Sequence, residues 1–340
     1  QKGVDEGATL VHDGRGYTVE GYENGFYLGP TLFDNVTTDM TVYKEEVFGP
    51  VLFIARADDY EQALAMATER VRAEGLADRF TPVHAAFDAF SQVLDDVGVK
   101  RVDAVFMDLG LSSLQIDETE RGFSYSHDAP LDMRMDVSQP LTAERVLAEY
   151  DEPALTRIFR TYGEERYARQ IARRIVQRRD REPLRTSAQL SALVDEVIPQ
   201  AHRPAGNPAK RVFQALRIEV NGELDKLAST LPQAANRLAV GGRLVVESYH
   251  SLEDKTVKTF MAQGLAADVP PGLPVIPPDA QPFFRDLTRG AVKADEGEIA
   301  HNPRSASVRL RGVELTRPIP QRWRRTFASA AEPRHYEGGR

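Results

Sequence analysis

The sequence predicts an α/β fold, in which helices cover a largely parallel sheet. Residues 102–107 and 244–246 are short, mainly apolar runs of the kind that forms buried strands. Helix-period segments lie around them, because apolar residues recur every three or four positions through residues 60–71 and every four or five through residues 158–175. Both strand-like runs end in acid-containing polar motifs. In open α/β sheets ligands bind at the carboxyl ends of strands, so we expect the functional site there.

The bulk composition narrows the class of protein. The 340 residues can hold one large domain or two ordinary ones, and they include no cysteine. The lack of cysteine excludes a disulfide framework, a zinc–thiolate site and a cysteine nucleophile, and no metal is expected. No apolar run approaches the roughly 20 residues of a membrane helix, and nothing at the start is typical of a signal peptide. We therefore expect a cytoplasmic protein with no membrane partner, and homo-oligomerisation stays open.

The charge of the chain is unevenly distributed. The net charge is -8, but residues 1–69 alone carry four Lys/Arg and thirteen Asp/Glu. The remainder is therefore close to neutral and contains locally basic stretches that could face phosphates. Overall acidity does not exclude nucleic-acid binding by residues 70–340.

Several long motifs follow the predicted strands and helices. They begin at Asp108-Leu-Gly-Leu-Ser-Ser-Leu-Gln, Pro130-Leu-Asp-Met-Arg-Met-Asp, Asn207-Pro-Ala-Lys-Arg, Glu247-Ser-Tyr-His-Ser-Leu-Glu-Asp-Lys and Asn302-Pro-Arg-Ser. Through these motifs, residues from about 70 to 328 closely resemble the ribosomal RNA small-subunit methyltransferase H family. The resemblance implies a Rossmann-like class I methyltransferase core with a helical insert. It also implies methylation of the exocyclic amine of a cytosine in 16S ribosomal RNA, with S-adenosyl-L-methionine as the methyl donor.

The front of the chain resembles a different family. The motifs Gly25-Phe-Tyr-Leu-Gly-Pro-Thr-Leu-Phe and Tyr43-Lys-Glu-Glu-Val-Phe-Gly-Pro are similar to the carboxyl-terminal half of an aldehyde dehydrogenase. In that family the matching positions, here Glu46 and Phe48, contact the ribose of the nicotinamide cofactor. Aldehyde oxidation needs a cysteine nucleophile, which this chain lacks. We interpret the chain as a chimeric fusion whose join lies inside the helix predicted at residues 60–71.

These resemblances predict the domain organisation. An aldehyde-dehydrogenase-like segment, residues 1–69, stands in for the first strands of the methyltransferase. The methyltransferase core takes residues 70–112 and 226–315, interrupted by a helical insert at residues 113–225, and residues 316–340 form a basic tail. Residues 306–311 alternate like an edge strand. Trp323 and the residues after it look poorly packed.

The fusion removes part of the implied cofactor site. Class I methyltransferases start with a strand, a glycine-rich turn and a helix, because only glycine lets the backbone approach the cofactor closely. The family's Gly-Gly-His turn is not visible here, nor is the acid that binds the ribose. Asp58 could replace that acid, or it could be a solvated residue that starts a helix. We therefore predict weak or absent cofactor binding.

Other positions of the implied cofactor site are retained. The resemblance assigns Phe87 to the adenine, Asp108 to the acid after the fourth strand and Gln115 to an amide shortly beyond it. Asp108 and His250 are the candidate catalytic residues, since the weakly nucleophilic cytosine amine needs a hydrogen-bond acceptor for one of its protons. Phe87 could instead be a core residue, Asp108 could cap a turn, and His250 could be a structural histidine.

The helical region carries the candidates for RNA binding. Residues 157–185 contain ten arginines and four acids, and an arginine-rich face can neutralise phosphates. The resemblance favours Lys210, Arg211, Arg217 and Asn221 as contacts of the small-subunit ribosomal RNA. The alternative is a capped helix whose cations pair with Glu219 and Glu223. Three functions stay open: an active methyltransferase, a catalytically inactive RNA-binding remnant, and an aldehyde dehydrogenase fragment.

Overall fold

The computed structural model describes residues 2–18, 29–44, 51–53, 60–110, 121–124, 128–203, 206–267, 269 and 275–324. The chain divides into two compact units, Gln1–Ala86 and Phe87–Arg340. The boundary predicted at residues 69 and 70 lies inside helix α3, Tyr60–Ala73, which belongs to the first unit. The helix predicted at residues 60–71 is thus confirmed as one unbroken helix.

The first unit contains a three-stranded sheet in the order β1-β2-β3. The strands β1 and β2 pair antiparallel, whereas β2 and β3 pair parallel. A small core gathers around Phe33, Val36 and Met40. The elements of this unit are α1 (Lys2–Asp5), β1 (Thr9–His12), β2 (Thr31–Asp34), α2 (Thr41–Lys44), β3 (Val51–Phe53), α3 and the 3-10 helix η1 (Ala77–Arg79).

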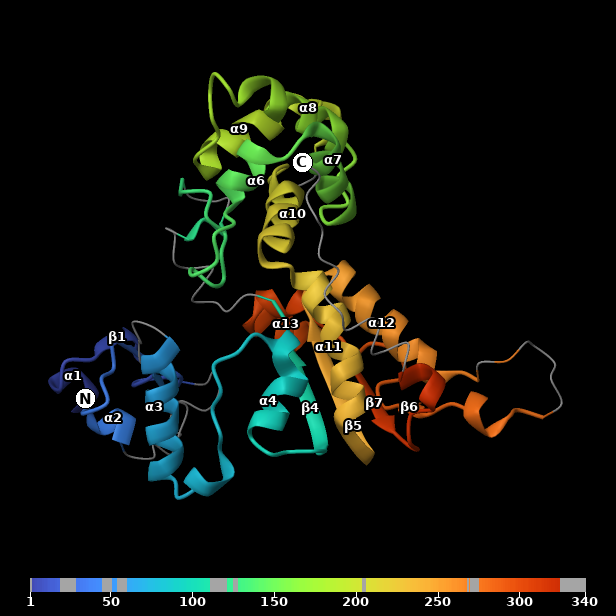
Figure 1. The fold of residues 1–340 in the computed structure, drawn as a ribbon. Coiled ribbons are helices and arrows are strands. Elements are labelled where there is room, and N and C mark those ends of the chain that lie inside the picture. The colour runs from blue at the N-terminus through green and yellow to red at the C-terminus, as the bar shows by residue number, and fades with distance from the viewer. Residues whose placement is uncertain are drawn as a thin grey trace. The chain divides into compact units, whose positions relative to one another are not determined.

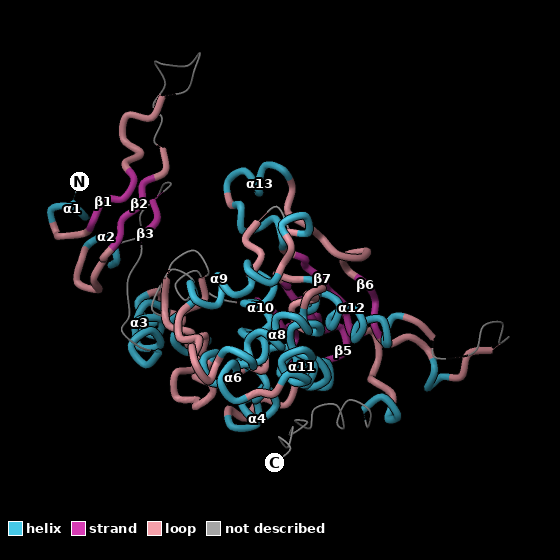
Figure 2. The backbone as a smooth tube through the Cα atoms, turned by 90° about the horizontal axis from the view of Figure 1, so that it is seen from above, coloured by secondary structure: helices cyan, strands magenta, loops and turns pink. Residues whose placement is uncertain are grey.

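The second unit is built on a mixed sheet in the order β4-β5-β7-β6. Strands β4 (Val102–Asp108) and β5 (Leu238–Ser248) are parallel, so the predicted parallel pairing is confirmed for this pair. Strand β7 (Arg309–Leu315) runs antiparallel to β5 and to β6 (Phe284–Asp286). The predicted edge position of residues 306–311 is wrong, because β7 begins only at Arg309 and its outer side is paired, at Leu310 by a bridge to Val292 and at residues 313–315 by β6. Figure 2 shows the strands of the two units as separate sheets.

Helices pack against one face of this sheet and form its core. Strand β4 turns Val105 and Met107 into the core, whereas Phe106 on the opposite face is 62% exposed. Helices α11 (Glu223–Arg237) and α12 (Ser251–Leu265) run beside β5 in Figure 1 and contact it. Trp323 packs against Phe283 in the same core, with ring centroids 6.2 Å apart, so its predicted poor packing is wrong.

The helical pattern predicted between residues 142 and 225 is confirmed. Its helices are amphipathic, and apolar side chains four residues apart, such as Ile171 and Ile175, are fully buried in a separate core. Side chains of Thr142, Asp151 and Thr186 cap helix starts. The helices are α6 (Ala143–Glu149), α7 (Glu152–Thr161), α8 (Ala168–Arg178), α9 (Ser187–Val197) and α10 (Lys210–Asn221).

The remaining elements of the second unit are short α-helices and 3-10 helices. They are η2 (Phe87–Ala89), α4 (Phe90–Asp96), η4 (Gln200–His202), η5 (Pro278–Ala280), α13 (Glu296–His301) and η6 (Pro303–Ser307). Among the described residues, no helix is both long enough and apolar enough to span a bilayer.

Candidate functional site

Asp108 lies where the sequence predicts it, at the carboxyl end of β4. Its register partner on β5 is Glu247, and the amide of Leu109 donates to the carbonyl of Glu247 at 3.1 Å. The strand alternates, so the core-facing residues Val105 and Met107 leave Asp108 on the opposite, exposed face. The fold therefore presents one accessible carboxylate at the edge of the sheet where ligands bind in α/β proteins.

Tyr249, just beyond β5, holds this carboxylate. The phenol oxygen of Tyr249 donates to Oδ1 of Asp108 at 2.8 Å. Burial, the hydrogen bond to Asp108 and the nearby acids together raise the pKa of Tyr249 well above its ordinary value, so the hydroxyl stays a donor. In the described part of the chain, Oδ2 of Asp108 has no recorded partner. One oxygen is thus fixed, and the other can accept a hydrogen bond from a ligand.

The turn after β4 fits closely against the Tyr249 ring. Gly110 has a φ of +89°, which favours glycine, and a Cβ built there would lie 3.3 Å from Cδ2 of Tyr249. Glu247 adds a second acid nearby, and its pKa is raised by burial and by the charges of Asp108 and Glu298. Sequence analysis assigned no role to Tyr249; its position two residues beyond Glu247, an acid at a strand end, was the available signal.

His250 and Glu253 fix the backbone of Tyr249. His250 is the N-cap of α12, and its Nδ1 accepts from the amide of Glu253 at 3.4 Å. The Glu253 carboxylate accepts from the amides of Tyr249 at 2.8 Å and His250 at 3.2 Å. Burial opposes ionisation of Glu253, but hydrogen bonds from His250 and the Tyr249 amide outweigh it and lower its pKa. His250 therefore caps α12 one residue after Tyr249, which holds Asp108.

A buried ion pair extends this network to the helical insert. Nε and Nη2 of Arg217 on α10 each lie 2.9 Å from an oxygen of Glu223, the first residue of α11. Burial raises the pKa of Glu223, which Arg217 opposes. Ligand atoms of Glu223, His250 and Glu253 lie within 4.8 Å of one another, a spacing that a metal ion could use. Because Arg217 occupies Glu223, the Glu253 amide donates to Nδ1 of His250 and Nε2 of His250 lies 3.3 Å from Oε1 of Glu253, we interpret the cluster as a structural ion network.

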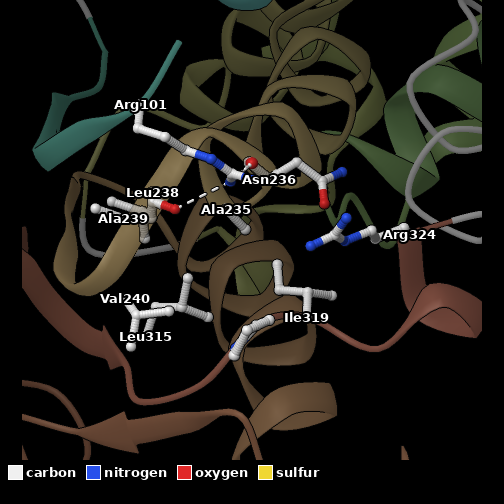
Figure 3. Close-up of a pocket in the computed structure, with 10 residues that line it drawn as sticks. Arg101, Ala235, Asn236, Leu238, Ala239, Val240, Leu315, Ile319 and Arg324 are labelled. Carbon is white, nitrogen blue, oxygen red and sulfur yellow. Dashed lines mark hydrogen bonds between the residues drawn. The ribbon is translucent and has the colours of Figure 1, made fainter.

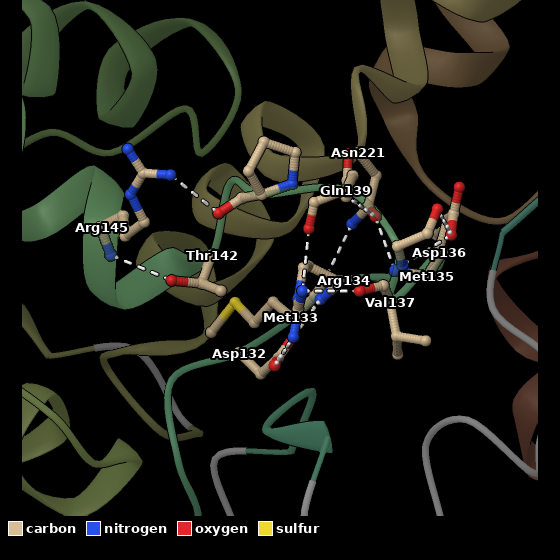
Figure 4. A network of polar contacts seen from close by, with 12 residues as sticks. Asp132, Met133, Arg134, Met135, Asp136, Val137, Gln139, Thr142, Arg145 and Asn221 are labelled. Atoms are coloured by element: carbon tan, nitrogen blue, oxygen red, sulfur yellow. Dashed lines mark hydrogen bonds and ion pairs between the residues drawn. The ribbon is translucent and has the colours of Figure 1, made fainter.

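The Asp132–Gln139 loop is pinned to the same end of α10 (Figure 4). Asn221 accepts from the amide of Met135 at 2.7 Å and donates to the carbonyls of Met133 at 2.8 Å and Arg217 at 2.9 Å. Arg134 pairs with Asp132 at 2.8 Å and donates to two further carbonyls of the loop. The loop is thus folded by its own polar groups and by Asn221, which is 5% exposed.

Replacing Asn221 by leucine should therefore destabilise the fold. The change leaves the Met135 amide and the Met133 carbonyl without their partners, which we expect to cost about 2 to 4 kcal/mol in the free energy of unfolding. Urea titration followed by circular dichroism measures this. The control is Gln92→Leu on α4, whose exposed side chain bonds only to Asp96, and it should change stability by less than about 0.5 kcal/mol. Equal midpoints for the two variants would contradict the assigned role of Asn221.

Comparison with known proteins places this site in a family. A profile of the MraW methylase family matches residues 24–316, most of the chain. The chain belongs to that family. Ribosomal RNA small subunit methyltransferase H of Bifidobacterium longum strain DJO10A is 79% identical over 275 residues, covering 81% of this chain and 77% of the relative. The enzyme of the same name from Frankia alni is 54% identical over 283 residues, covering 83% and 87%.

One solved structure gives a separate likeness. A solved methylmalonate-semialdehyde dehydrogenase from Sinorhizobium meliloti 1021, complexed with NAD, is 51% identical, with a TM-score of 0.20. The match covers 20% of this chain and only 14% of the dehydrogenase chain. The family profile starts at residue 24, earlier than the resemblance that begins near residue 70.

Of the other predicted cofactor residues, Phe87 is among those that the structure describes. Phe87 opens the second unit in η2 and is 41% exposed, so it is not a core residue. The side chain of Gln233 on α11 holds this segment, donating to the Asp88 carbonyl at 2.8 Å and accepting from the Ser91 amide at 3.0 Å. Gln115, Asp58, Glu46 and Phe48 lie outside the described residues.

The arginine-rich helices carry less free charge than the sequence indicates. Arg169 and Arg173 approach Glu152, whereas Arg174 and Arg178 approach Glu196. These acids lie outside residues 157–185, so the local count missed them. Most of this surface is therefore charge-paired. Within residues 157–185, which the structure describes throughout, three arginines are exposed with no recorded side-chain partner: Arg160, Arg166 and Arg181.

The RNA candidates on α10 divide into two pairs. Arg217 pairs with Glu223, as the alternative interpretation expected, and Asn221 is buried in the loop network. Lys210 and Arg211 are exposed at the start of the helix. Arg211 donates to the carbonyl of Glu164 at 3.0 Å, which leaves most of its guanidinium accessible. Arg217 and Asn221 therefore stabilise the site from within, whereas Lys210 and Arg211 face outward.

Proposed function

We propose that this protein methylates the exocyclic amine of a cytosine in small-subunit ribosomal RNA with S-adenosyl-L-methionine, and that it binds this cofactor weakly. The observation that carries the proposal is the Asp108 carboxylate, held through one oxygen by Tyr249 at the end of β4 with its other oxygen available. Membership of the MraW methylase family supports methyl transfer. The names of its relatives support ribosomal RNA as the substrate and hence a cytoplasmic location.

The described residues fit this cofactor in part. Exposed Phe87 offers an aromatic surface for adenine, and Asp108 offers a carboxylate; Gln115 is the third candidate. The bound cofactor supplies a methyl group already activated by its positive sulfur. The protein therefore mainly has to align the amine and exclude water.

Asp108 is the candidate acceptor for the target amine. The lone pair of a cytosine amine is delocalised into the ring, so an acceptor that takes a hydrogen bond from the amine increases its nucleophilicity. The free Oδ2 of Asp108 can do this while Tyr249 prevents the carboxylate from rotating away. His250 is the second candidate, and we assign it to positioning because it caps α12 and joins Glu253 in fixing Tyr249.

Lys210 and Arg211, at the start of α10, offer a surface for the RNA strand close to this site. The turn at Glu164 joins the two, because its carbonyl accepts from Arg211 and its carboxylate accepts from Ser251 at 3.0 Å. Ser251 follows Tyr249 by two residues, so these contacts bring the start of α10 near Tyr249 and Asp108. Lys210 and Arg211 can there neutralise phosphates on either side of the target nucleotide.

Changing Lys210 to glutamine should weaken RNA binding in a salt-dependent way. Loss of one phosphate contact should lower the slope of log affinity against log salt by about one. Fluorescence anisotropy with a labelled ribosomal RNA hairpin, at several salt concentrations, measures both. Arg145→Gln is the matched control, because Arg145 is exposed on α6 and paired with Glu149. If both variants keep the parent slope, α10 does not contact the phosphates.

The alternatives predict different results in the same assays. An RNA-binding remnant would bind RNA with this salt dependence but would not methylate it, a reading favoured by the missing glycine-rich turn. An aldehyde dehydrogenase fragment would bind a nicotinamide cofactor in a way that Glu46→Ala removes. If Asp58 replaces the lost acid, Asp58→Ala should abolish adenosylmethionine binding.

A further inference from the structure

A second concave site lies at the opposite end of the sheet from Asp108. A pocket of about 340 Å³ opens beside the amino ends of β4 and β5 and the carboxyl end of β7 (Figure 3). Strand β4 starts near the pocket at Val102 and ends at Asp108, so at about 3.3 Å per residue the two sites are roughly 20 Å apart. The volume lies in the range typical of small-molecule sites.

The floor of this pocket is apolar. The core residues Ala235, Leu238, Leu315 and Ile319 form its base and are almost fully buried, and its accessible apolar surface lies at Pro318 and Val240. Val240 is 58% exposed at the rim. A flat, weakly polar group would gain free energy by covering this surface.

The polar part of the wall is cationic. Arg101 and Arg324 both line the pocket, and Figure 3 shows Asn236 between them. No carboxylate is among the described lining residues, and neither arginine has a recorded ion pair within the described ranges. By contrast, Arg237 pairs with Asp95 and Arg311 with Asp254 in the same unit.

Two further observations indicate a prepared site. Nη1 of Arg101 donates to the carbonyls of Asn236 and Leu238, the latter at 3.1 Å, so the guanidinium is held in place. Its Nε and Nη2 remain available within the described part of the chain. The side chain of Asn236 lines the pocket; its Oδ1 is buried, whereas its Nδ2 is accessible and has no recorded partner among the described residues. A ligand acceptor could bind Nδ2.

We propose that this pocket binds a nucleoside monophosphate unit. The base covers the apolar surface at Val240 and Pro318, a ring nitrogen or carbonyl of the base accepts from Nδ2 of Asn236, and the phosphate lies against Arg101 and Arg324. A free nucleotide and a nucleotide of an RNA strand share this chemistry. The site is independent of cofactor binding at Asp108.

The test is calorimetric titration of the full chain with cytidine monophosphate, adenosine monophosphate and a four-nucleotide RNA. Arg324→Ala should weaken binding of the ligand by about tenfold, as expected for loss of a charge-assisted hydrogen bond. Val240→Trp, which fills the rim, should do the same through sterics. Arg145→Ala, which removes an exposed arginine of α6 that is already paired with Glu149, is the control and should bind like the parent chain.

The outcomes separate the ligand sources and can overturn the proposal. Tighter binding of the RNA than of either mononucleotide, with the same loss in Arg324→Ala, identifies a strand as the source. Equal affinity for mononucleotides and RNA identifies a free nucleotide. If benzoate, which has an anion and a ring but no ring nitrogen or ring carbonyl, binds as well as the nucleotides, base recognition is wrong. If Arg324→Ala and Val240→Trp bind like the parent chain, or no nucleotide binds at all, the pocket assignment is wrong.

Discussion

Replacing residues 1–69 with the amino-terminal segment of the Bifidobacterium longum relative should raise the affinity for S-adenosyl-L-methionine by about a hundredfold or more. The family's glycine-rich turn, which brings backbone close to the bound donor, is not visible in this sequence. Displacement of a reacting group by about 1 Å can lower a rate by on the order of a hundredfold, so a missing wall should strongly impair transfer. Calorimetric titration of the two proteins side by side measures the affinity directly.

The comparison needs a control for a general loss of folding in the parent chain. Asn221 and its loop lie outside the exchanged segment, so both proteins should show the same unfolding transition for the helical insert. Micromolar binding of the donor by the parent chain, lost on Asp58→Ala, would show that the front segment supplies a substitute wall. Tight binding that does not depend on Asp58 would contradict the impairment proposal altogether.

In the restored protein, Asp108→Asn should lower the rate of methyl transfer by roughly a hundredfold to a thousandfold. Asparagine keeps the shape of the side chain, but it is a weaker acceptor than a carboxylate, and removal of one such electrostatic contact has effects of this order. Single-turnover methylation of a ribosomal RNA fragment measures the rate. Asp103→Asn is the matched control, since Asp103 is an exposed acid at the other end of the same strand.

A second variant distinguishes the role of Asp108 from that of Tyr249. Tyr249→Phe removes only the hydroxyl that donates to Asp108, and we expect about a tenfold loss of rate with little change in RNA affinity. If Asp108→Asn weakens donor binding as much as it slows transfer, Asp108 serves the cofactor alone. An unchanged rate in Asp108→Asn would remove Asp108 from the chemistry.

Some of the site could be predicted from the sequence because local patterns determine it. An apolar run followed by an acid is enough to put Asp108 at a strand end, and a period near 3.6 is enough to predict the helices of the insert. Family resemblance drew attention to Phe87 and His250. These inferences depend on residues that are neighbours in the chain.

The tertiary structure decided which polar groups find partners. Tyr249 meets Asp108 across 141 positions of sequence, and Asn221 meets the loop at Met133 across 88. The arginines of α8 are paired with acids outside their own segment, so their number overstated the free positive charge.

The helices of the insert, strand β4 with its terminal acid and the family resemblance could all be inferred from the sequence. The inner position of β7, the support of the site by Arg217 and Asn221, and the hold of Tyr249 on Asp108 became known only from the packed fold. Strand and helix periodicity is a property of adjacent residues. A hydrogen bond or ion pair depends on which distant side chains the packed core brings within about 3 Å of each other.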